Sequence, residues 1–415
     1  MRVNARNQSI LILGCFDTKE ENFNFLRQCI LSHGDMVISM NTGVMGSTSL
    51  FPVDFESDVV AKEGGQTIGH LRGKRDRGNA VEVMGRGASK LVAQLWAQGE
   101  IKAVIGMGGG GGTYIALAAM EALPLGFPKL CISTLATKDV SQQVGIKDIV
   151  LIPSVVDVAG LNRISRTIMR NAAAAISGMA KVVADANHNS LGTIAISMFG
   201  NTTACVDHCT KLLESKGYEV MAFHANGLGG KAMEALIREG CFEGVLDITT
   251  TELADELCGG ICSAGPDRLL AAVEMGIPQV VVPGCLDMVN FAHIDTVPAQ
   301  YASRQLYSWA PNVTLMRTNE HENKQLAIMI ADKLNRTRAS ETVLLPLKGL
   351  SQIDIEGSVF YHPEINQVLF DTLKEQLDDK VKVIEINSHI NEELFSHTAV
   401  EILLEKIKNF KIKYK

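Results

Sequence analysis

The sequence predicts an α/β protein of two Rossmann-like, doubly wound domains with mainly parallel sheets. Short apolar strands alternate with longer amphipathic segments over residues 9–282, the pattern of parallel sheets covered by helices on both faces. The alternation stops at the polar residues 185–190 and then restarts with similar turns. The length of 415 residues suits two or three domains. We therefore predict a first domain over residues 1–186 and a second over residues 187–415.

The first domain is expected to hold five strands and four main helices. The strands are predicted at residues 9–13, 36–40, 101–107, 129–132 and near 148–152, and the helices from about 20 to 33, 81 to 98, 113 to 122 and 161 to 183. Residues 47–84 are polar and are predicted to be irregular.

The second domain repeats this order of elements. Strands are expected at residues 193–198, 218–223, 244–248 and 279–282, and two more, at 342–347 and 381–386, extend the same sheet. Helices are expected over 320–334 and from about 392, and the C-terminal helix is a candidate to cross back to the first domain. Ligands are expected beyond the carboxyl ends of the strands.

Matched turns suggest an internal structural repeat. His33-Gly34 corresponds to Lys216-Gly217, Gly99 to Gly240, and Gly126-x-Pro128 to Gly276-x-Pro278. The spacing between these turns implies an insertion of about 40 residues between the second and third strands of the first copy. Unrelated doubly wound domains would share the alternation alone, so the repeat remains a hypothesis here.

Composition narrows the class of protein. Apolar residues make up 46% and charged residues 20%, with a net charge of −7. No basic stripe is present, which argues against DNA as a partner. The nine cysteines fit reduced core residues better than a disulfide framework. No apolar stretch reaches membrane-spanning length and no signal peptide is apparent, so we predict a cytoplasmic protein with no membrane partner.

A run of five glycines between a strand and a helix is the strongest functional signal. Residues 101–107 are apolar and β-branched, the run follows, and an alanine-rich helix is expected from Thr113. Glycine lets the backbone approach a ligand and adopt positive φ, and a helix N-terminus offers free N–H groups to an anion. A flexible linker is the alternative, which the apolar flanks disfavour. The run is neither a Walker A motif nor a strict GxGxxG fingerprint.

Other loops of the first domain complete a nucleotide-like set. They place hydroxyls, a lysine and a carboxylate at strand ends, where phosphate, ribose or Mg²⁺ can be bound. Asp17 and Thr18 can equally cap the following helix. The predicted cofactor-binding residues are Asp17, Thr18, Lys19, Gly108, Gly109, Gly110, Gly111, Gly112, Thr113, Ser133 and Thr134.

The corresponding loops of the second domain carry hydroxyls, acids and one histidine. For a substrate we expect Thr202, Thr249, Thr250, Thr251 and Asn290, and for catalysis Glu252, Asp255, His224 and Asp287. Thr249-x-x-Glu252 also fits a capping box, and a lone histidine is more often structural. No metal site is predicted, since Cys205 and Cys209 have no second ligand pair and are expected in the core. No Ser-His-Asp triad is visible.

Segments from nearly the whole chain resemble an uncharacterised-protein family that is typified by the ATP-binding N-terminal domain of the tomato mosaic virus resistance protein. The segments are GCFDTKEENFNFLR, DRGNAVEVM, IGMGGGGGTYIALAAMEALPLGFPKLCIST, PSVVDVAGLNRISR, FHANGLGGKAMEALIREG, LDITTTELADEL, SAGPDRL, GIPQVVVPGCLDMVNF, TLMRT and LPLKGLSQID. The resemblance implies two Rossmann-like domains, ATP binding and a homo-oligomer, with Asn162 and Arg163 joining the cofactor-binding set. Family members often carry serine in the middle of the glycine run, where this chain has glycine.

The leading hypothesis is an ATP-binding cytoplasmic protein of unassigned metabolic role. Its glycine run would hold the nucleotide phosphates, with Mg²⁺ as a candidate companion, and a small polar or anionic substrate would lie in the cleft between the domains. One alternative is a non-catalytic, nucleotide-dependent regulator or interaction module. A nucleotide-sugar-type transferase is another, on fold analogy alone. The sequence does not decide whether the protein is an enzyme.

Overall fold

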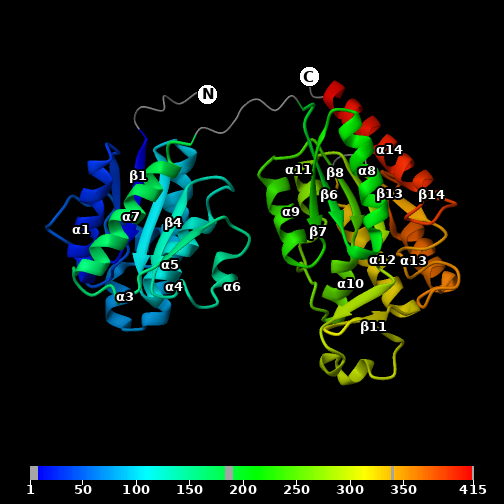
Figure 1. Cartoon of the computed structure of the whole chain (residues 1–415), viewed down its shortest axis with the longest axis horizontal. Helices are drawn as coiled ribbons and strands as arrows, with labels where there is room; N and C mark the ends of the chain where they lie inside the picture. The colour runs from blue at the N-terminus through cyan, green and yellow to red at the C-terminus, as the bar shows by residue number, and fades with distance from the viewer. Residues whose placement is uncertain (1–7, 183–189, 338–340, 414–415) are drawn as a thin grey trace. The chain divides into compact units, whose positions relative to one another are not determined.

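The structure is a computed structural model that describes residues 8–182, 190–337 and 341–413. It divides into two compact units, Met1–Ala186 and Asn187–Lys415 (Figure 1). The predicted domain boundary at residues 185–190 falls almost wholly outside the described residues, so its position stays a prediction.

The first unit is built on a five-stranded parallel sheet in the order β2-β1-β3-β4-β5. Its strands are β1 (Ser9–Gly14), β2 (Val37–Asn41), β3 (Ile101–Gly108), β4 (Lys129–Ser133) and β5 (Val150–Pro153). Its helices are α1 (Phe16–Ser32), α2 (Ser57–Glu63), α3 (Ile68–Lys74), α4 (Arg77–Ala97), α5 (Gly110–Glu121), α6 (Ser141–Val144) and α7 (Arg163–Met179).

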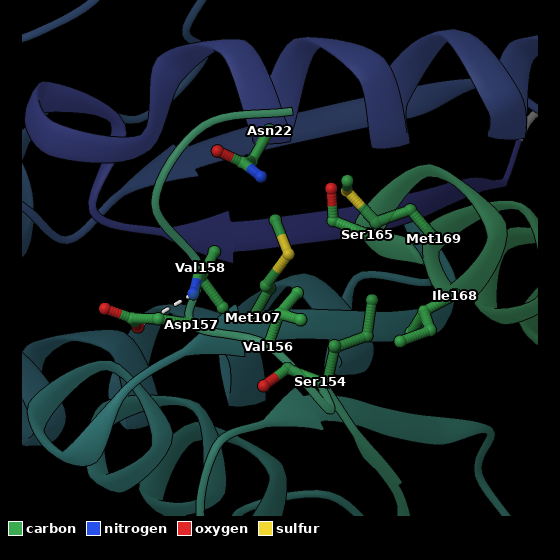
Figure 2. A pocket seen from close by; sticks show the side chains of 10 residues that line it. Asn22, Met107, Ser154, Val156, Asp157, Val158, Ser165, Ile168 and Met169 are labelled. Carbon is green, nitrogen blue, oxygen red and sulfur yellow. Dashed lines mark hydrogen bonds between the residues drawn. The ribbon is translucent and has the colours of Figure 1, made fainter. Parts of the chain in front are cut away.

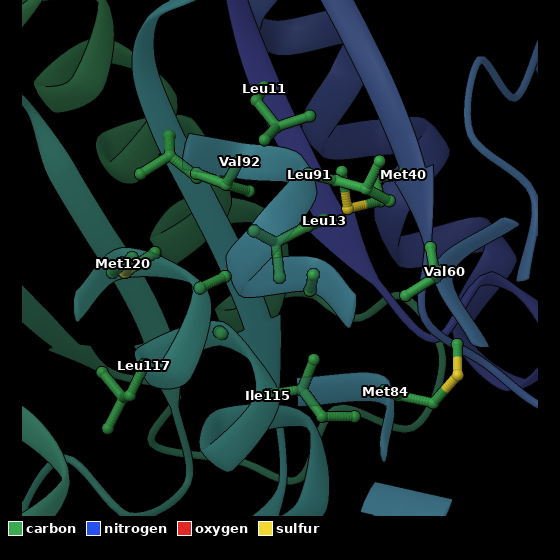
Figure 3. Close-up of a cluster of buried hydrophobic side chains, with 14 of the residues drawn as sticks. Leu11, Leu13, Met40, Val60, Met84, Leu91, Val92, Ile115, Leu117 and Met120 are labelled. Atoms are coloured by element: carbon green, nitrogen blue, oxygen red, sulfur yellow. The ribbon is translucent and has the colours of Figure 1, made fainter. Parts of the chain in front are cut away.

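Alternating side chains of β1 divide the first unit into two cores. Ile10 and Ile12 pack with residues of α1 and α7 on one face of the sheet. Leu11 and Leu13 pack with residues of α2 to α5 on the other face (Figure 3). This is the period of two that a strand buried on both faces requires, and it gives three layers of helix, sheet and helix.

The second unit has a six-stranded parallel sheet in the order β14-β13-β9-β8-β6-β7. Its strands are β6 (Thr193–Met198), β7 (Glu219–His224), β8 (Gly244–Thr249), β9 (Gln279–Gly284), β13 (Glu341–Pro346) and β14 (Val381–Ile386). Its α-helices are α8 (Thr203–Ser215), α9 (Leu228–Arg238), α10 (Thr251–Cys258), α11 (Ala271–Met275), α12 (Glu320–Leu334), α13 (Pro363–Gln376) and α14 (Glu393–Lys413). α8 and α14 cover one face of the sheet, and α9 to α13 the other.

An antiparallel sheet and three short 3₁₀ helices complete the second unit. The sheet has the order β10-β12-β11, with β10 (Met288–Phe291), β11 (Leu306–Ala310) and β12 (Val313–Arg317). The 3₁₀ helices are η2 (Gly200–Thr202), η3 (Ile294–Thr296) and η4 (Ala299–Tyr301). This sheet is not predicted from the sequence: residues 287–290 are expected in a loop, whereas Asn290 is paired with Leu315.

The fold class is confirmed, and the strand orders support the repeat. If β6, β7, β8 and β9 are matched to β1, β2, β3 and β4, both sheets follow the same order, with β13 matching β5 and β14 added at the edge. All six glycines of the matched turns have positive φ: Gly34 and Gly217, Gly99 and Gly240, and Gly126 and Gly276. Such φ values favour glycine, which is why the turns can be recognised in the sequence.

Two further expectations are wrong. Residues 47–84 contain α2, α3 and the start of α4, short helices whose polar sequences hide them. The helix after the glycine run begins at Gly110, not Thr113. The C-terminal helix α14 packs on α8, β8 and β9 of its own unit, through residues such as Leu403 and Ile407, and its predicted crossing to the first domain stays a prediction. Among the described residues, no helix combines the length and apolarity that a membrane span requires.

Candidate functional site

A pocket of about 580 Å³ lies at the carboxyl ends of the strands in the first unit. It is lined by Asp17 and Thr18 after β1, by the loop after β2, and by Gly111 and Gly112 after β3. β1 lies between β2 and β3, where the strand order reverses. Open α/β sheets bind their ligands at this switch point, so the position and the size are those of a small-molecule site. We call it the switch-point pocket.

Three arginines enter the pocket from the segment that was predicted to be irregular. They are Arg72 and Arg75 at the end of α3 and Arg77 at the start of α4. Two acidic residues, Asp17 and Asp76, also line the pocket. Arg75 has left-handed backbone, with φ 52° and ψ 25°, which is costly for a residue with a side chain. The pocket thus has a net positive lining and a strained residue, both common at functional sites.

The glycine run meets the pocket through two of its five residues. Gly108 ends β3, Gly109 is the N-cap of α5, and the other three form the first helical turn. None of the five has positive φ; the need for glycine is steric. A Cβ on Gly108 would lie 2.7 Å from Gly112 Cα, and one on Gly111 would lie 3.1 Å from Val81 Cγ2 in the pocket wall. The tight turn aims the N-terminus of α5 at the pocket.

Asp17 connects the loops after β1 and β2. Its Oδ2 accepts a hydrogen bond of 2.8 Å from the Met45 N–H, while its buried Oδ1 has no hydrogen-bond partner among the described residues. Gly43 packs against this carboxylate, since a Cβ there would lie 2.3 Å from Oδ1. An unsatisfied buried acceptor beside a pocket is a feature that a bound ligand or cation would explain. Cys15 also lines the pocket, and burial raises the pKa of its thiol.

The other predicted cofactor-binding residues have partners within the protein. The Lys19 ammonium donates to the Val158 carbonyl. The hydroxyls of Thr113 and Ser133 are 2.7 Å apart and buried, and the Thr134 N–H donates to the Gly108 carbonyl. Asn162 is the N-cap of α7 in a capping box, and exposed Arg163 is the first helical residue. None of these six lines the switch-point pocket, and their ligand roles stay predictions.

A much smaller pocket lies beside β3, near the start of α7. It has room of about 10 Å³, roughly that of one water molecule. Figure 2 shows Asn22, Met107, Ser165 and Met169 around it. It can hold a water but not a nucleotide.

The second unit has a buried ionic cluster where acid chemistry was expected. Arg268 is fully buried and forms a bidentate pair with Asp247, with two N–O distances of 2.6 Å. It also donates to Glu252 at 2.6 Å and to Glu234 at 3.1 Å. Burial alone would lower the pKa of Arg268, but Asp247 and Glu252 outweigh it and hold that pKa well above its usual range. The guanidinium thus stays charged inside the protein.

Glu252 binds a glycine loop as well as the arginine. Its Oε1 accepts the N–H groups of Gly227 and Gly230 at 2.8 and 3.1 Å. A Cβ on Gly230 would lie 2.1 Å from Oε2, so the loop needs glycine to admit the carboxylate. The capping box predicted for Thr249 and Glu252 is wrong, because the N-cap of α10 is Thr250 and no side-chain cap bond forms.

The predicted hydroxyl and acid residues do lie together, but inside the protein. Thr202 and Thr249 share a hydroxyl contact of 2.7 Å. The Asn290 amide donates to Asp255 at 2.8 Å and to Thr251 at 3.2 Å. The Thr250 hydroxyl donates to the Val282 carbonyl. Each of these six side chains is at most 1% exposed. Burial raises the pKa of Asp255 to about 7.

Asp287 and His224, the last two predicted catalytic residues, differ in their exposure to solvent. Asp287 is fully buried and accepts a hydrogen bond of 2.7 Å from Ser351. Burial, with nearby Asp354, raises its pKa to about 7. His224 is exposed at the end of β7 and stacks on Phe199, with ring centroids 5.3 Å apart. The catalytic and substrate roles of all these residues stay predictions.

Two sets of charged residues are absent from the predicted sites: the three arginines of the switch-point pocket and the buried Arg268. The three pocket arginines belong to a visible basic cluster, RGKRDR at residues 72–77, which could have signalled an anion site. Arg268 carries no such signal, because its carboxylate partners lie 16 to 34 residues away in the chain.

Models for two domains of one family match most of the chain. They are the N-terminal domain of the Uncharacterised protein family (UPF0261), over residues 8–185, and its C-terminal domain, over residues 192–407. A UPF0261 protein of Clostridium tetani is 47% identical over 399 residues, which are 96% of this chain and 98% of that protein.

A plant relative and two solved structures extend the comparison. The ToMV resistance protein Tm-1(GCR237) of Solanum lycopersicum is 36% identical over 97% of this chain, which spans 56% of that protein. The S. aureus MnaA–UDP structure has 7% identity and a TM-score of 0.23, covering 89% of this chain and 93% of its own. Os79 from O. sativa in complex with UDP has 8% identity and a TM-score of 0.25, covering 95% and 100%. These two scores are too low to support an argument about function.

Proposed function

The chain belongs to the uncharacterised protein family UPF0261, and from this premise we propose that its first unit binds ATP in the switch-point pocket. The observation that carries the proposal is the meeting of a helix N-terminus and three arginines in one pocket of about 580 Å³. That volume suits a nucleotide. The predicted family resemblance is confirmed, whereas ATP binding is our inference from the site.

The polar residues that line the pocket are groups that can hold a polyphosphate. N–H groups at the start of α5 face an anion without competition from side chains, because the turn is made of glycines. Arg75 and Arg77 form no salt bridge with any residue that the structure describes, so their guanidinium groups are left for phosphate oxygens. The buried Oδ1 of Asp17 is the acceptor that a Mg²⁺ ion or a ribose hydroxyl would use.

Apolar side chains also line the pocket. Val44, Leu71, Met84 and Ile115 line it, and they offer a surface on which a purine base can pack. A free phosphate or a short dicarboxylate would leave this surface uncovered. The combination of cationic and apolar lining residues therefore favours a nucleotide over a small inorganic anion.

We infer no reaction, and ATP serves either as a reactant in an unassigned metabolic step or as a conformational ligand. The first reading makes the protein an enzyme, and the second makes it a nucleotide-dependent regulator. ATP turnover that depends on a second small molecule separates them. The cytoplasmic location and the homo-oligomer stay predictions.

Two neighbouring glycines provide a matched test. The Cβ of Gly111→Leu would point at Val81 and Arg77 in the pocket, whereas that of Gly110→Leu meets no atom within 4 Å. Calorimetric titration of the full chain with Mg–ATP should show binding weakened about tenfold or more by Gly111→Leu and little changed by Gly110→Leu. Equal loss in both variants, or no binding to the wild type, contradicts the proposal. Tighter binding of UDP-N-acetylglucosamine than of ATP would instead favour the transferase alternative.

A further inference from the structure

A second pocket, of about 600 Å³, lies at the carboxyl ends of the strands in the second unit. We propose that it binds a small hydroxyl- or amine-bearing molecule that carries no net negative charge. This site is separate from the nucleotide pocket of the first unit, and the inference does not depend on ATP binding there. We call it the acidic pocket, after its charged lining residues.

The internal repeat relates the position of the acidic pocket to that of the switch-point pocket. It is lined by Gly200, Asn201 and Thr203, which follow β6 and begin α8. β6 corresponds to β1 of the first unit, where the loop after the strand lines the switch-point pocket. Each copy of the repeat therefore has a pocket beside the loop that follows its first strand, the place where this topology binds ligands.

Buried amide and imidazole groups form the floor of the pocket. Asn201 is 1% exposed; its Nδ2 faces the Met288 sulfur at 3.6 Å, and its buried Oδ1 has no hydrogen-bond partner among the described residues. An unsatisfied buried oxygen beside a pocket is explained by a ligand that donates a hydrogen bond to it. A hydroxyl or an amino group does this, whereas a phosphate oxygen, an acceptor, does not.

His389 is fixed by hydrogen bonds at the same floor. It is 4% exposed. Its Nδ1 accepts the Asn391 N–H at 3.1 Å, so its Nε2 carries the proton and donates to the Ser351 carbonyl at 2.9 Å. Asn391 in turn donates to the Asn201 carbonyl at 3.0 Å and accepts the Cys205 N–H at 3.2 Å. The floor is thus fixed by hydrogen bonds.

The charged residues that line the acidic pocket are both acids. They are Asp207 and Glu392, both exposed at its rim, and no lysine or arginine of the described residues lines it. The hydrogen bond from Ser388 lowers the pKa of the Glu392 carboxyl, and nearby Lys348 lowers it further. Lys348 is not among the residues that line the pocket. The carboxylates oppose the attraction of the α8 N-terminus for anions. The switch-point pocket has the reverse balance, with three arginines and two acids.

Charged thiol reagents can measure this difference directly. Ala204→Cys places a thiol in the acidic pocket at an exposed position, and Val81→Cys places one in the switch-point pocket. The full chain is treated with a cationic and an anionic methanethiosulfonate, and modification of each new cysteine is followed by peptide mass spectrometry. The ratio of cationic to anionic rates should be about tenfold higher at residue 204 than at residue 81. Asp207→Asn in the Ala204→Cys protein should reduce that ratio.

Ligand protection completes the test. Glucosamine, ethanolamine or myo-inositol should slow modification of residue 204, and inorganic phosphate should not. Equal rate ratios at the two positions, protection by phosphate, or no protection by any of the three other compounds overturns the proposal. Ile355→Cys, at another exposed lining position, serves as a second reporter if Ala204→Cys folds poorly. ATP titration of the same proteins reports on the first unit, so failure of one proposal is distinguishable from failure of the other.

Discussion

Arg268 and Asp247 face each other in the interior of the second unit, joined by two N–O contacts of 2.6 Å. With Glu252, Glu234 and the Thr249 carbonyl, all five N–H donors of the guanidinium have acceptors. A buried charge with that many partners is tolerated because none of its hydrogen-bonding capacity is lost. Glu252, one of the acids that the sequence suggests for chemistry, is therefore held by an arginine, and this arrangement leads to the first prediction.

Glu252→Gln should destabilise the protein by about 3–5 kcal/mol, the range for breaking a buried ion pair. Both carboxylate oxygens accept hydrogen bonds, one from Gly227 and Gly230 and the other from Arg268. An amide placed there in either orientation sets its NH₂ group against another donor. Urea unfolding measures the loss, and His224→Ala, at an exposed position, is the control and should change stability little. Full stability of Glu252→Gln with loss of a ligand-dependent turnover would instead support a catalytic role.

Arg75→Gly should stabilise the first unit while weakening ATP binding. The left-handed backbone of Arg75 costs about 1 kcal/mol or more for a residue with a Cβ, and glycine removes that cost. The same change removes one cation from the switch-point pocket. Thermal unfolding and nucleotide titration of one variant measure both effects. Lower stability, or unchanged affinity, would contradict the roles assigned to this residue.

Asp255→Asn should remove part of the pH dependence of stability. The pKa of Asp255 is raised to about 7 by burial, so the folded state keeps a proton that the unfolded state has lost above a pH of about 4. This contribution is complete below pH 4 and is lost as the pH rises toward 7, so the free energy of unfolding falls across that window.

Comparison of the Asp255→Asn variant with the wild type isolates the contribution of Asp255 to the pH dependence of stability. The unfolding free energy of the variant, relative to wild type, should rise on the order of 3 kcal/mol between pH 4 and 7. Asn290 Oδ1 has no partner among the described residues, so its amide can rotate to meet the new NH₂ group, and the variant should fold. A difference that does not vary with pH would show that Asp255 is ionised throughout.

Two glycines with positive φ should respond differently to alanine. A Cβ on Gly227 (φ +90°) would lie 2.7 Å from the Ser263 carbonyl oxygen, whereas one on Gly240 (φ +75°) meets nothing within 4 Å. Gly240→Ala should cost about 1 kcal/mol for backbone strain alone, and Gly227→Ala about 3 kcal/mol because a clash is added. Chemical denaturation measures both. Equal costs would mean that the Gly227 loop moves freely to admit a side chain.

The fold could be predicted from the sequence largely because its signals are local. Apolar strands reveal themselves over five or six residues, and the positive-φ glycines of the matched turns mark where helices end. The seven-residue helices α2 and α3 gave no such signal: their stability comes from packing Val60 and Leu71 into the core and from the Thr67 cap. The antiparallel sheet was missed because its strands carry no clear alternation.

The candidate sites could be predicted only in part, for a related physical reason. A loop at the end of a parallel strand can be placed from the strand alone, and Asp17, Thr18 and two residues of the glycine run do line one pocket. Burial of a charged residue depends on a distant partner, so the sequence does not show that Glu252 and Asp255 are buried. The pocket arginines come from an insertion whose fold could not be foreseen.

The three glycines that open α5 have a consequence for dynamics. Each costs the helix about 1 kcal/mol relative to alanine, so this turn is held by its neighbours and not by its own propensity. A bound anion that accepts hydrogen bonds from the N–H groups of this turn would stabilise it, which the glycines cannot do because they have no side chains. Amide hydrogen exchange at the first turn of α5 should therefore slow on nucleotide binding more than elsewhere in the helix, which makes this turn a reporter of occupancy.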